Sequence, residues 1–85
     1  MQPIVLVGHR HTCPTHGTGT VITGAAQASA NGRPIARVGD EISCGAVIVT
    51  GSSTATLDGQ AVARQGDATS HGGVLIEGDP GWLVD

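Results

Sequence analysis

Residues 8–17, GHRHTCPTHG, hold three of the four histidines of the chain and one of its two cysteines. Imidazole nitrogens and cysteine thiolates are the donors that zinc sites in proteins use. The other two residues of these types, Cys44 and His71, lie far along the chain. A single metal centre built from all of them would need a fold that brings three distant segments together.

A repeat of 27 residues supplies such a fold. It is marked by three equally spaced glycines, Gly24, Gly51 and Gly78. The same offset carries RVGD (37–40) onto RQGD (64–67). At the N-terminus, PIVLVG (3–8) matches PIARVG (34–39) at an offset of 31. Self-similarity at a fixed period indicates a repeat architecture. We therefore predict three cyclically arranged units, four additional residues in the first unit, and chain termini that lie close together.

Each unit is expected to consist of short strands joined by turns. Asn31-Gly32 and the equivalent Asp58-Gly59 predict hairpins, because both residue types tolerate a positive φ. Helical periodicity is confined to a weak GAAQASAN (24–31), which the repeat overrides. The sequence thus predicts a compact, all-β, pseudo-threefold fold.

The candidate metal ligands follow the repeat. Cys44 lies seven residues before Gly51, and His71 lies seven before Gly78. A one-residue bulge in the first unit makes His16 the third equivalent group. Three equivalent positions in a threefold fold point toward one axis, so these three side chains are expected to converge.

The four additional residues fall around HTCPT (11–15), and they are expected to supply a fourth donor for tetrahedral Zn²⁺. His11 is the favoured donor, which gives three imidazoles and one thiolate. Cys13 is the alternative, which gives two of each. His9 takes the place that Asp40 and Asp67 hold in the other units, so it is assigned to the turn. The predicted metal set is His11, His16, Cys44 and His71 around one structural Zn²⁺, with Cys13 as the alternative fourth ligand.

The composition limits other interpretations. In 85 residues there are 14 glycines, no Phe and no Tyr, so the core is small and a metal staple is expected. Trp82, the one aromatic residue, is expected to fill the core or plug the base. A net charge of −3 and the absence of a basic patch argue against nucleic-acid binding. The N-terminus lacks the features of a signal peptide, which disfavours a Cys13–Cys44 disulfide.

Two segments, PIAR (34–37) and AVAR (61–64), are each followed by x-Gly-Asp, and the second continues to SHGG (70–73). With these motifs the chain resembles the PAAR-repeat proteins, although the N-terminal copy, PIVL (3–6), lacks the arginine. The resemblance implies a small cone of β-hairpins with zinc near its vertex. It also implies metal ligation by His16, Cys44 and His71, together with His11 or Cys13.

The function that the resemblance implies is structural. The cone caps the trimeric VgrG β-helix of a bacterial type VI secretion spike, sharpens it for puncture of a target membrane, and attaches effector proteins. We expect a single domain over residues 1–85 with no extension or effector domain, a monomer on its own, made in the cytoplasm and exported by type VI secretion.

The competing interpretation is a small zinc-dependent hydrolase. Catalytic zinc keeps a position open for water and usually has a carboxylate nearby as general base. Here the available carboxylates, Glu41 and Asp67, fall in turn segments, and the chain has no HExxH motif. We therefore expect no catalytic residues.

Overall fold

The computed structural model describes residues 2–14, 17–57 and 59–84. The described part contains strands and no helix, which confirms the all-β prediction, and it therefore offers no helix long and apolar enough to cross a membrane. The strands are β1 (Gln2–Ile4), β2 (Arg10–Cys13), β3 (Gly17–Thr20), β4 (Ser29–Ala30), β5 (Arg33–Pro34), β6 (Thr56–Leu57), β7 (Gln60–Ala61), β8 (Val74–Leu75) and β9 (Asp79–Val84).

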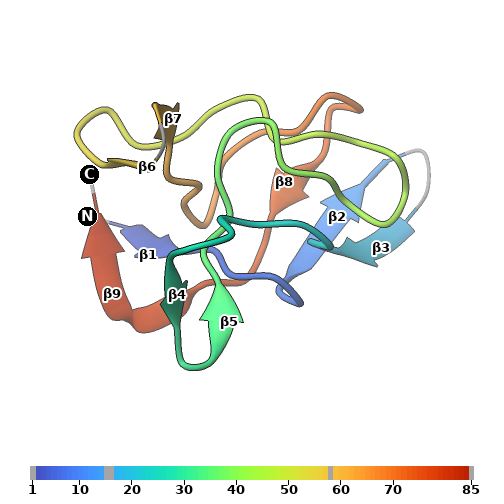
Figure 1. The fold of residues 1–85 in the computed structure, drawn as a ribbon. Coiled ribbons are helices and arrows are strands. Elements are labelled where there is room, and N and C mark those ends of the chain that lie inside the picture. Colours follow the sequence, from blue (N-terminus) through green and yellow to red (C-terminus); the bar gives the residue numbers. More distant parts are fainter. Residues whose placement is uncertain (1, 15–16, 58, 85) are drawn as a thin grey trace.

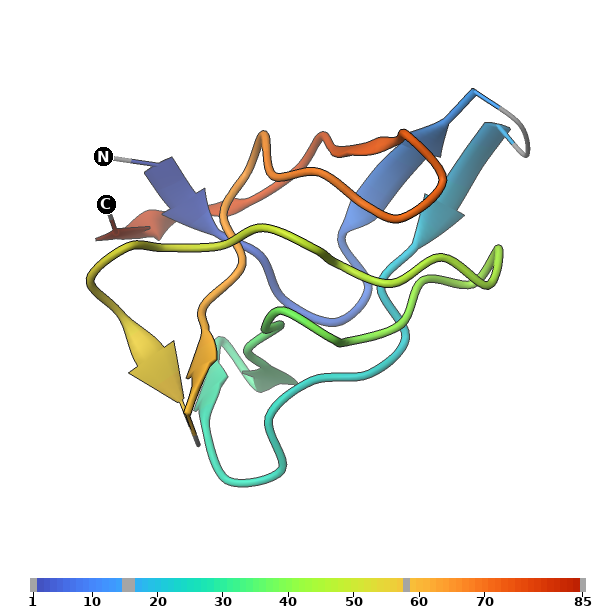
Figure 2. The same cartoon turned by 90° about the horizontal axis from the view of Figure 1, so that it is seen from above.

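Three antiparallel strand pairs, β1–β9, β4–β5 and β6–β7, lie toward one end of the molecule, which we call the base (Figure 1). The β2–β3 hairpin, with β8 on the outer side of β2, lies at the opposite end, which we call the tip (Figure 2). The molecule measures 29 × 23 × 23 Å, with one long axis and two equal short ones. These dimensions suit a threefold body that runs from base to tip.

Each strand pair of the base corresponds to one repeat unit. Asn31 (φ 52°) and Gly32 (φ 78°) turn the chain between β4 and β5, as the Asn-Gly pair predicts. Gly59 (φ 79°) holds the equivalent place between β6 and β7, and its predicted partner Asp58 lies outside the described residues. The third strand pair is made by the two ends of the chain, where Gln2 pairs with Val84. This pairing confirms that the termini complete one shared unit.

A closed ring of three backbone hydrogen bonds surrounds the molecular axis. Val5 N donates to Ala63 O (3.0 Å), Ala63 N to Ala36 O (2.9 Å), and Ala36 N to Val5 O (2.9 Å). All three residues have 0% exposure and occupy the same position in PIVLVG, PIARVG and AVARQG. The ring confirms the pseudo-threefold arrangement, because each unit contributes one donor and one acceptor to it.

The side chains that alternate along these three segments contribute to two small cores. One contains the ring residues and is built from Val5, Val21, Ala36, Ile42, Ala46, Ile48, Ala63 and Leu75. The other lies against the strand pairs of the base and is built from Ile4, Leu6, Ala30, Ile35 and Val62. Trp82 belongs to neither core and is 55% exposed, so the expectation that it fills the core is wrong.

The marker glycines of the repeat are sites of close approach between segments. A Cβ atom added to any of them would lie under 3 Å from another Cβ, in the pairs Gly24 with Pro34 (2.9 Å), Gly51 with Ala61 (2.9 Å) and Gly78 with Pro3 (2.7 Å). The 27-residue period therefore marks places where the backbone leaves no room for a side chain.

Candidate metal centre

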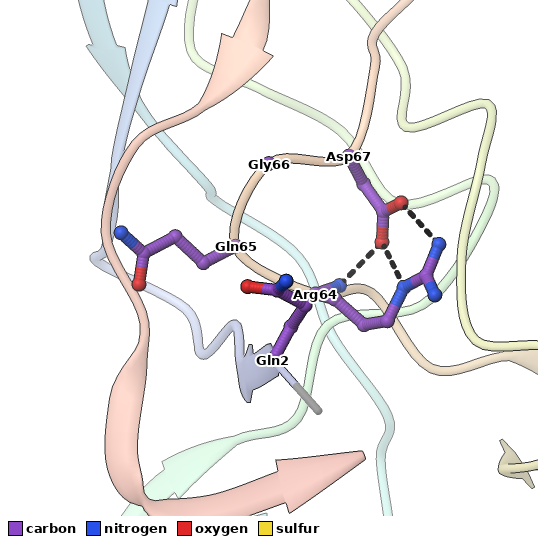
Figure 3. A pocket seen from close by; sticks show the side chains of 5 residues that line it. All are labelled: Gln2, Arg64, Gln65, Gly66 and Asp67. Atoms are coloured by element: carbon purple, nitrogen blue, oxygen red, sulfur yellow. Dashed lines mark hydrogen bonds and ion pairs between the residues drawn. The ribbon is translucent and has the colours of Figure 1, made fainter. Parts of the chain in front are cut away.

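Each unit contains a tight turn that leads toward the tip. The side chain of the fourth residue in the turn stabilises it by accepting a backbone hydrogen bond. In the third unit the Asp67 carboxylate accepts the Arg64 backbone N–H (2.6 Å) and a guanidinium N–H of the same arginine (2.9 Å), as Figure 3 shows. In the second unit the Asp40 carboxylate accepts the Arg37 backbone N–H at 2.7 Å. These arginines therefore fix turns, and in the pocket of Figure 3 the charged groups of Arg64 and Asp67 bond to each other.

His9 fastens the turn of the first unit. Its Nδ1 accepts the Leu6 backbone N–H at 3.0 Å, in the place of the aspartate carboxylates, which confirms its assignment to the turn. Because Nδ1 must be unprotonated to accept, this bond requires the neutral imidazole in its Nε2–H tautomer. Burial lowers the pKa of His9, although the nearby Glu77 carboxylate acts in the opposite direction.

Glu77 takes the position that threonine holds in the other units. The Thr23 hydroxyl donates to the Asp40 carboxylate (3.0 Å), and the Thr50 hydroxyl donates to Asp67 (2.9 Å). Glu77 instead accepts the Arg10 backbone N–H at 2.9 Å, which lowers the pKa of its carboxyl group. The turn residue His9 thus has the Glu77 carboxylate near it.

The residues four positions after His9, Asp40 and Asp67 converge at the tip. They are Cys13, Cys44 and His71, and one donor atom from each lies within 4.8 Å of those of the other two. Cys13 is the last residue of β2, so the group sits at the end opposite the strand pairs of the base (Figure 1). The fold therefore brings together one donor from each repeat unit.

This donor group fits a metal ion. In zinc sites the Cys sulfur lies about 2.3 Å and the His nitrogen about 2.0–2.1 Å from the ion. Donors around one ion are therefore separated by less than about 4.6 Å, and the distances at the tip fall in that range or slightly outside it. Cys13 and Cys44 carry thiols, so the competing disulfide is not formed in the structure.

The structure brings Cys44 and His71 together as predicted, but it gives the third equivalent position to Cys13. His16, the residue predicted for that position, lies outside the described residues. Counting backward from Gly24 pointed to His16 because the four additional residues lie between Cys13 and that glycine. Counting forward from the turn residue would have identified Cys13.

His11 lies next to this group, in a layer of the core. Its position in the repeat is that of Ile42 and Thr69, and it is 0% exposed. Its Nε2 lies 2.7 Å from Thr69 Oγ1, whereas its Nδ1 is buried with no hydrogen-bond partner among the described residues. Burial lowers the pKa of His11, and the neighbouring His71 lowers it further.

The imidazole of His11 is accommodated by a glycine. A Cβ atom at Gly73 would collide with the His11 ring and with the Thr12 carbonyl oxygen. Ala46 holds the equivalent position in the second unit. Gly73 and His11 are therefore matched to each other in shape.

Together these features define a class of protein: a small β-cone built from three repeat units that each direct one Cys or His to a shared site at the tip. A model of the PAAR motif matches residues 1–50 and 15–77, which together span most of the chain. The chain belongs to the PAAR motif family, the family of type VI secretion spike tips. A comparison with curated proteins gave no match.

Membership in this family bears on the two functions weighed from the sequence. PAAR motif proteins are structural spike components rather than enzymes. The structural interpretation is therefore the stronger one.

Proposed function

We propose that this protein caps the trimeric VgrG protein of a type VI secretion spike, with its base as the contact surface and a Zn²⁺ ion holding the tip. The closed threefold ring of Val5, Ala36 and Ala63 is the observation that carries this proposal. A single chain with internal threefold symmetry can present one unit to each protomer of a trimer.

The base has the surface that such a contact needs. Ile4, Ile35 and Val62, equivalent in the three units, line an apolar pocket there. Trp82 lines the same pocket, and it and Leu83 are exposed on β9 (55% and 46%). Exposed aromatic and aliphatic side chains around an apolar pocket are suited to anchoring a protein partner.

Zn²⁺ is the ion that the donor types favour, since thiolate and imidazole donors together select it over hard cations such as Mg²⁺. We assign Cys13, Cys44 and His71 as ligands, with His16 as the fourth. This set is the two-thiolate, two-imidazole alternative derived from the sequence. His11 already has its Nε2 against Thr69 and its ring against Gly73, so we assign it a supporting role.

The rest of the proposal concerns the path of the protein. It is made in the bacterial cytoplasm, binds to the spike, and leaves the cell with the spike during type VI secretion. Its contact with a target membrane is mechanical, and effector proteins are carried with it. The metal suits this task because a tip has little volume for a hydrophobic core, and coordinate bonds replace packing there.

Binding to purified trimeric VgrG tests the proposal. We expect one chain per trimer, measured by light scattering of the complex, because the three units of one chain occupy all three protomers. The double variant Trp82→Ala/Leu83→Ala should weaken binding, because it removes the exposed apolar side chains of the base. The control is Val49→Ala/Ile76→Ala, which removes exposed apolar side chains (48% and 43%) outside the base strands. Three chains per trimer, or equal binding by both variants, would refute this function.

A further inference from the structure

We propose that Cys13 and Cys44 form an oxidisable thiol pair, and that their conversion to a disulfide releases the metal from the tip. The metal-release part of this inference rests on the metal centre of the proposed function. The thiol pair itself rests only on the placement of the two cysteines.

The two thiols are close although they come from different units. Cys13 ends β2, Cys44 lies in the turn after Ile42, and their sulfur atoms lie within 4.8 Å of each other. Two of the three described donors can therefore be oxidised to one product, and only His71 cannot. A disulfide between them would link the first unit to the second at the tip.

The two cysteines differ in exposure, and this difference assigns their roles. Cys44 is half-buried, whereas Cys13 is only 3% exposed. A small oxidant such as hydrogen peroxide therefore reaches Cys44 first, because oxidation follows thiolate character and access. Cys13 is shielded from the oxidant but adjacent to the oxidised sulfur, which is the position of a resolving cysteine.

The turn that carries Cys44 has open space beside it. Gly45 follows it with a φ of +91°, and a Cβ added to that glycine would meet no atom within 4 Å. The sulfur atoms must approach to about 2.05 Å to form a bond. Movement of this open turn, rather than of the paired strand β2, can supply the approach.

The chemistry balances with a hydroperoxide as the oxidant. The Cys44 sulfur attacks hydrogen peroxide, the O–O bond breaks, and Cys44 sulfenic acid and one water form. The Cys13 sulfur then attacks the Cys44 sulfur, the S–O bond breaks, and a second water leaves with the thiol proton. Two thiols are oxidised by two electrons in total, and one peroxide is reduced to two waters.

Metal loss follows because the disulfide sulfurs are no longer thiolates. Thiolate is the form of cysteine that binds metal, so oxidation withdraws both Cys13 and Cys44 as ligands. The tip would then exchange a metal cross-link for a covalent one. A protein that passes from a reducing cytoplasm to an oxidising exterior would make this exchange on the way.

The experiment treats the purified, metal-loaded chain with hydrogen peroxide. We expect a mass decrease of about 2 Da, the loss of two hydrogens, and release of one metal ion per chain to a chromogenic chelator. Peptide mapping without reduction should recover a fragment that joins Cys13 to Cys44. Dithiothreitol followed by Zn²⁺ should restore the starting mass and metal content.

The Cys13→Ser variant is the matched control, since Cys44 then lacks its resolving thiol. It should take up oxygen at Cys44, with a mass gain of about 32 Da for the sulfinic acid, and form no intramolecular link. If this variant does not fold, the peptide map of the unaltered chain decides the question by itself.

Two results would overturn the inference: oxygen uptake at Cys44 with Cys13 unmodified in the unaltered chain, or a link between two separate chains. If the protein takes up no Zn²⁺ during loading but still forms the Cys13–Cys44 link, the metal centre and the release step are refuted, while the thiol pair stands. Capture of VgrG by the reduced protein is measured on the same samples, so a failure of the capping function is seen separately.

Discussion

The backbone N–H of Val5 donates to the carbonyl oxygen of Ala63 at 3.0 Å, across 58 positions of the chain. This bond joins the first unit directly to the third and closes the ring that Ala36 completes. With three residues at the axis and none of them exposed, the ring leaves little space for larger side chains.

Ala36→Leu should therefore destabilise the protein. Inserting extra methylenes into a packed core typically costs about 1–3 kcal/mol, and the ring offers no open side for relief. The free energy of unfolding, measured with denaturant, is the readout. The control is the exposed Ala26→Leu, which should stay within about 0.5 kcal/mol of the parent protein. Equal effects of both substitutions would contradict a tightly packed axis.

The turn of the first unit can be converted to the pattern of the others. His9→Asp alone places a carboxylate near Glu77, so it should be destabilising. Adding Glu77→Thr supplies the hydroxyl that pairs with the aspartate in the other units. We expect the second substitution to recover stability, with a coupling of about 0.5–3 kcal/mol in a double-mutant cycle. Additive effects would show that the two positions do not interact.

The parent protein and the His9→Asp/Glu77→Thr variant should also differ in how their free energy of unfolding depends on pH. The folded state holds the pKa of His9 below its ordinary value of 6.5, so below that pH the unfolded chain binds more protons than the folded one. The free energy of unfolding of the parent protein should therefore fall between pH 7 and pH 5. The His9→Asp/Glu77→Thr protein should lose less over this range. Subtracting the two curves removes any effect of acid on the metal ligands, which both proteins share.

Gly73→Ala should destabilise the protein more than Ala46→Gly, the reverse substitution at the equivalent position of the second unit. The added methyl group collides with the His11 ring and the Thr12 carbonyl oxygen, so we expect a loss of about 1–3 kcal/mol. Ala46→Gly makes the reverse change at the equivalent position and should cost about 0.5–1 kcal/mol. Thermal melts of both variants give the comparison, and a harmless Gly73→Ala would mean that His11 does not pack there.

Substitution of the ligands tests the metal assignment. Cys13→Ser, Cys44→Ser and His71→Ala should each lose the metal and lower the melting temperature, because structural zinc in peptides supplies about 10–16 kcal/mol of folding free energy. His16→Ala should behave in the same way. Bound metal is measured by elemental analysis after gel filtration.

His11→Gln is the informative comparison, because glutamine can still bond Thr69. It should retain the metal and lose only stability. Loss of the metal from His11→Gln together with its retention by His16→Ala would make His11 the fourth ligand, through the Nδ1 that has no hydrogen-bond partner among the described residues.

The sequence was most informative where one physical constraint recurs. The glycine spacing predicted the three units because each of these glycines lies against another segment with no room for a Cβ. The pairing of the termini and the role of His9 followed from the same alignment and were confirmed.

The prediction was less accurate in the first unit, where the repeat is interrupted. The additional residues extend the β2–β3 hairpin, in which Cys13 pairs with Gly17, and no repeat signal indicates on which side of them the ligand falls. The packing of His11 against Thr69 and Gly73 could not be predicted either, because the sequence does not distinguish a buried imidazole from a metal-bound one. Trp82 was assigned by residue type alone, and its exposure depends on the position of β9 at the base.

The ring at the axis also has a consequence for synthesis. Its last member, Ala63, and the metal-group member His71 both lie in the third unit, so neither the ring nor the metal group is complete until that unit has left the ribosome. Contacts between residues distant in sequence slow folding, because the chain must first lose loop entropy. The ring and the metal group therefore cannot close before the third unit is made, and uptake of the metal by all three donors reports that this unit has joined the other two.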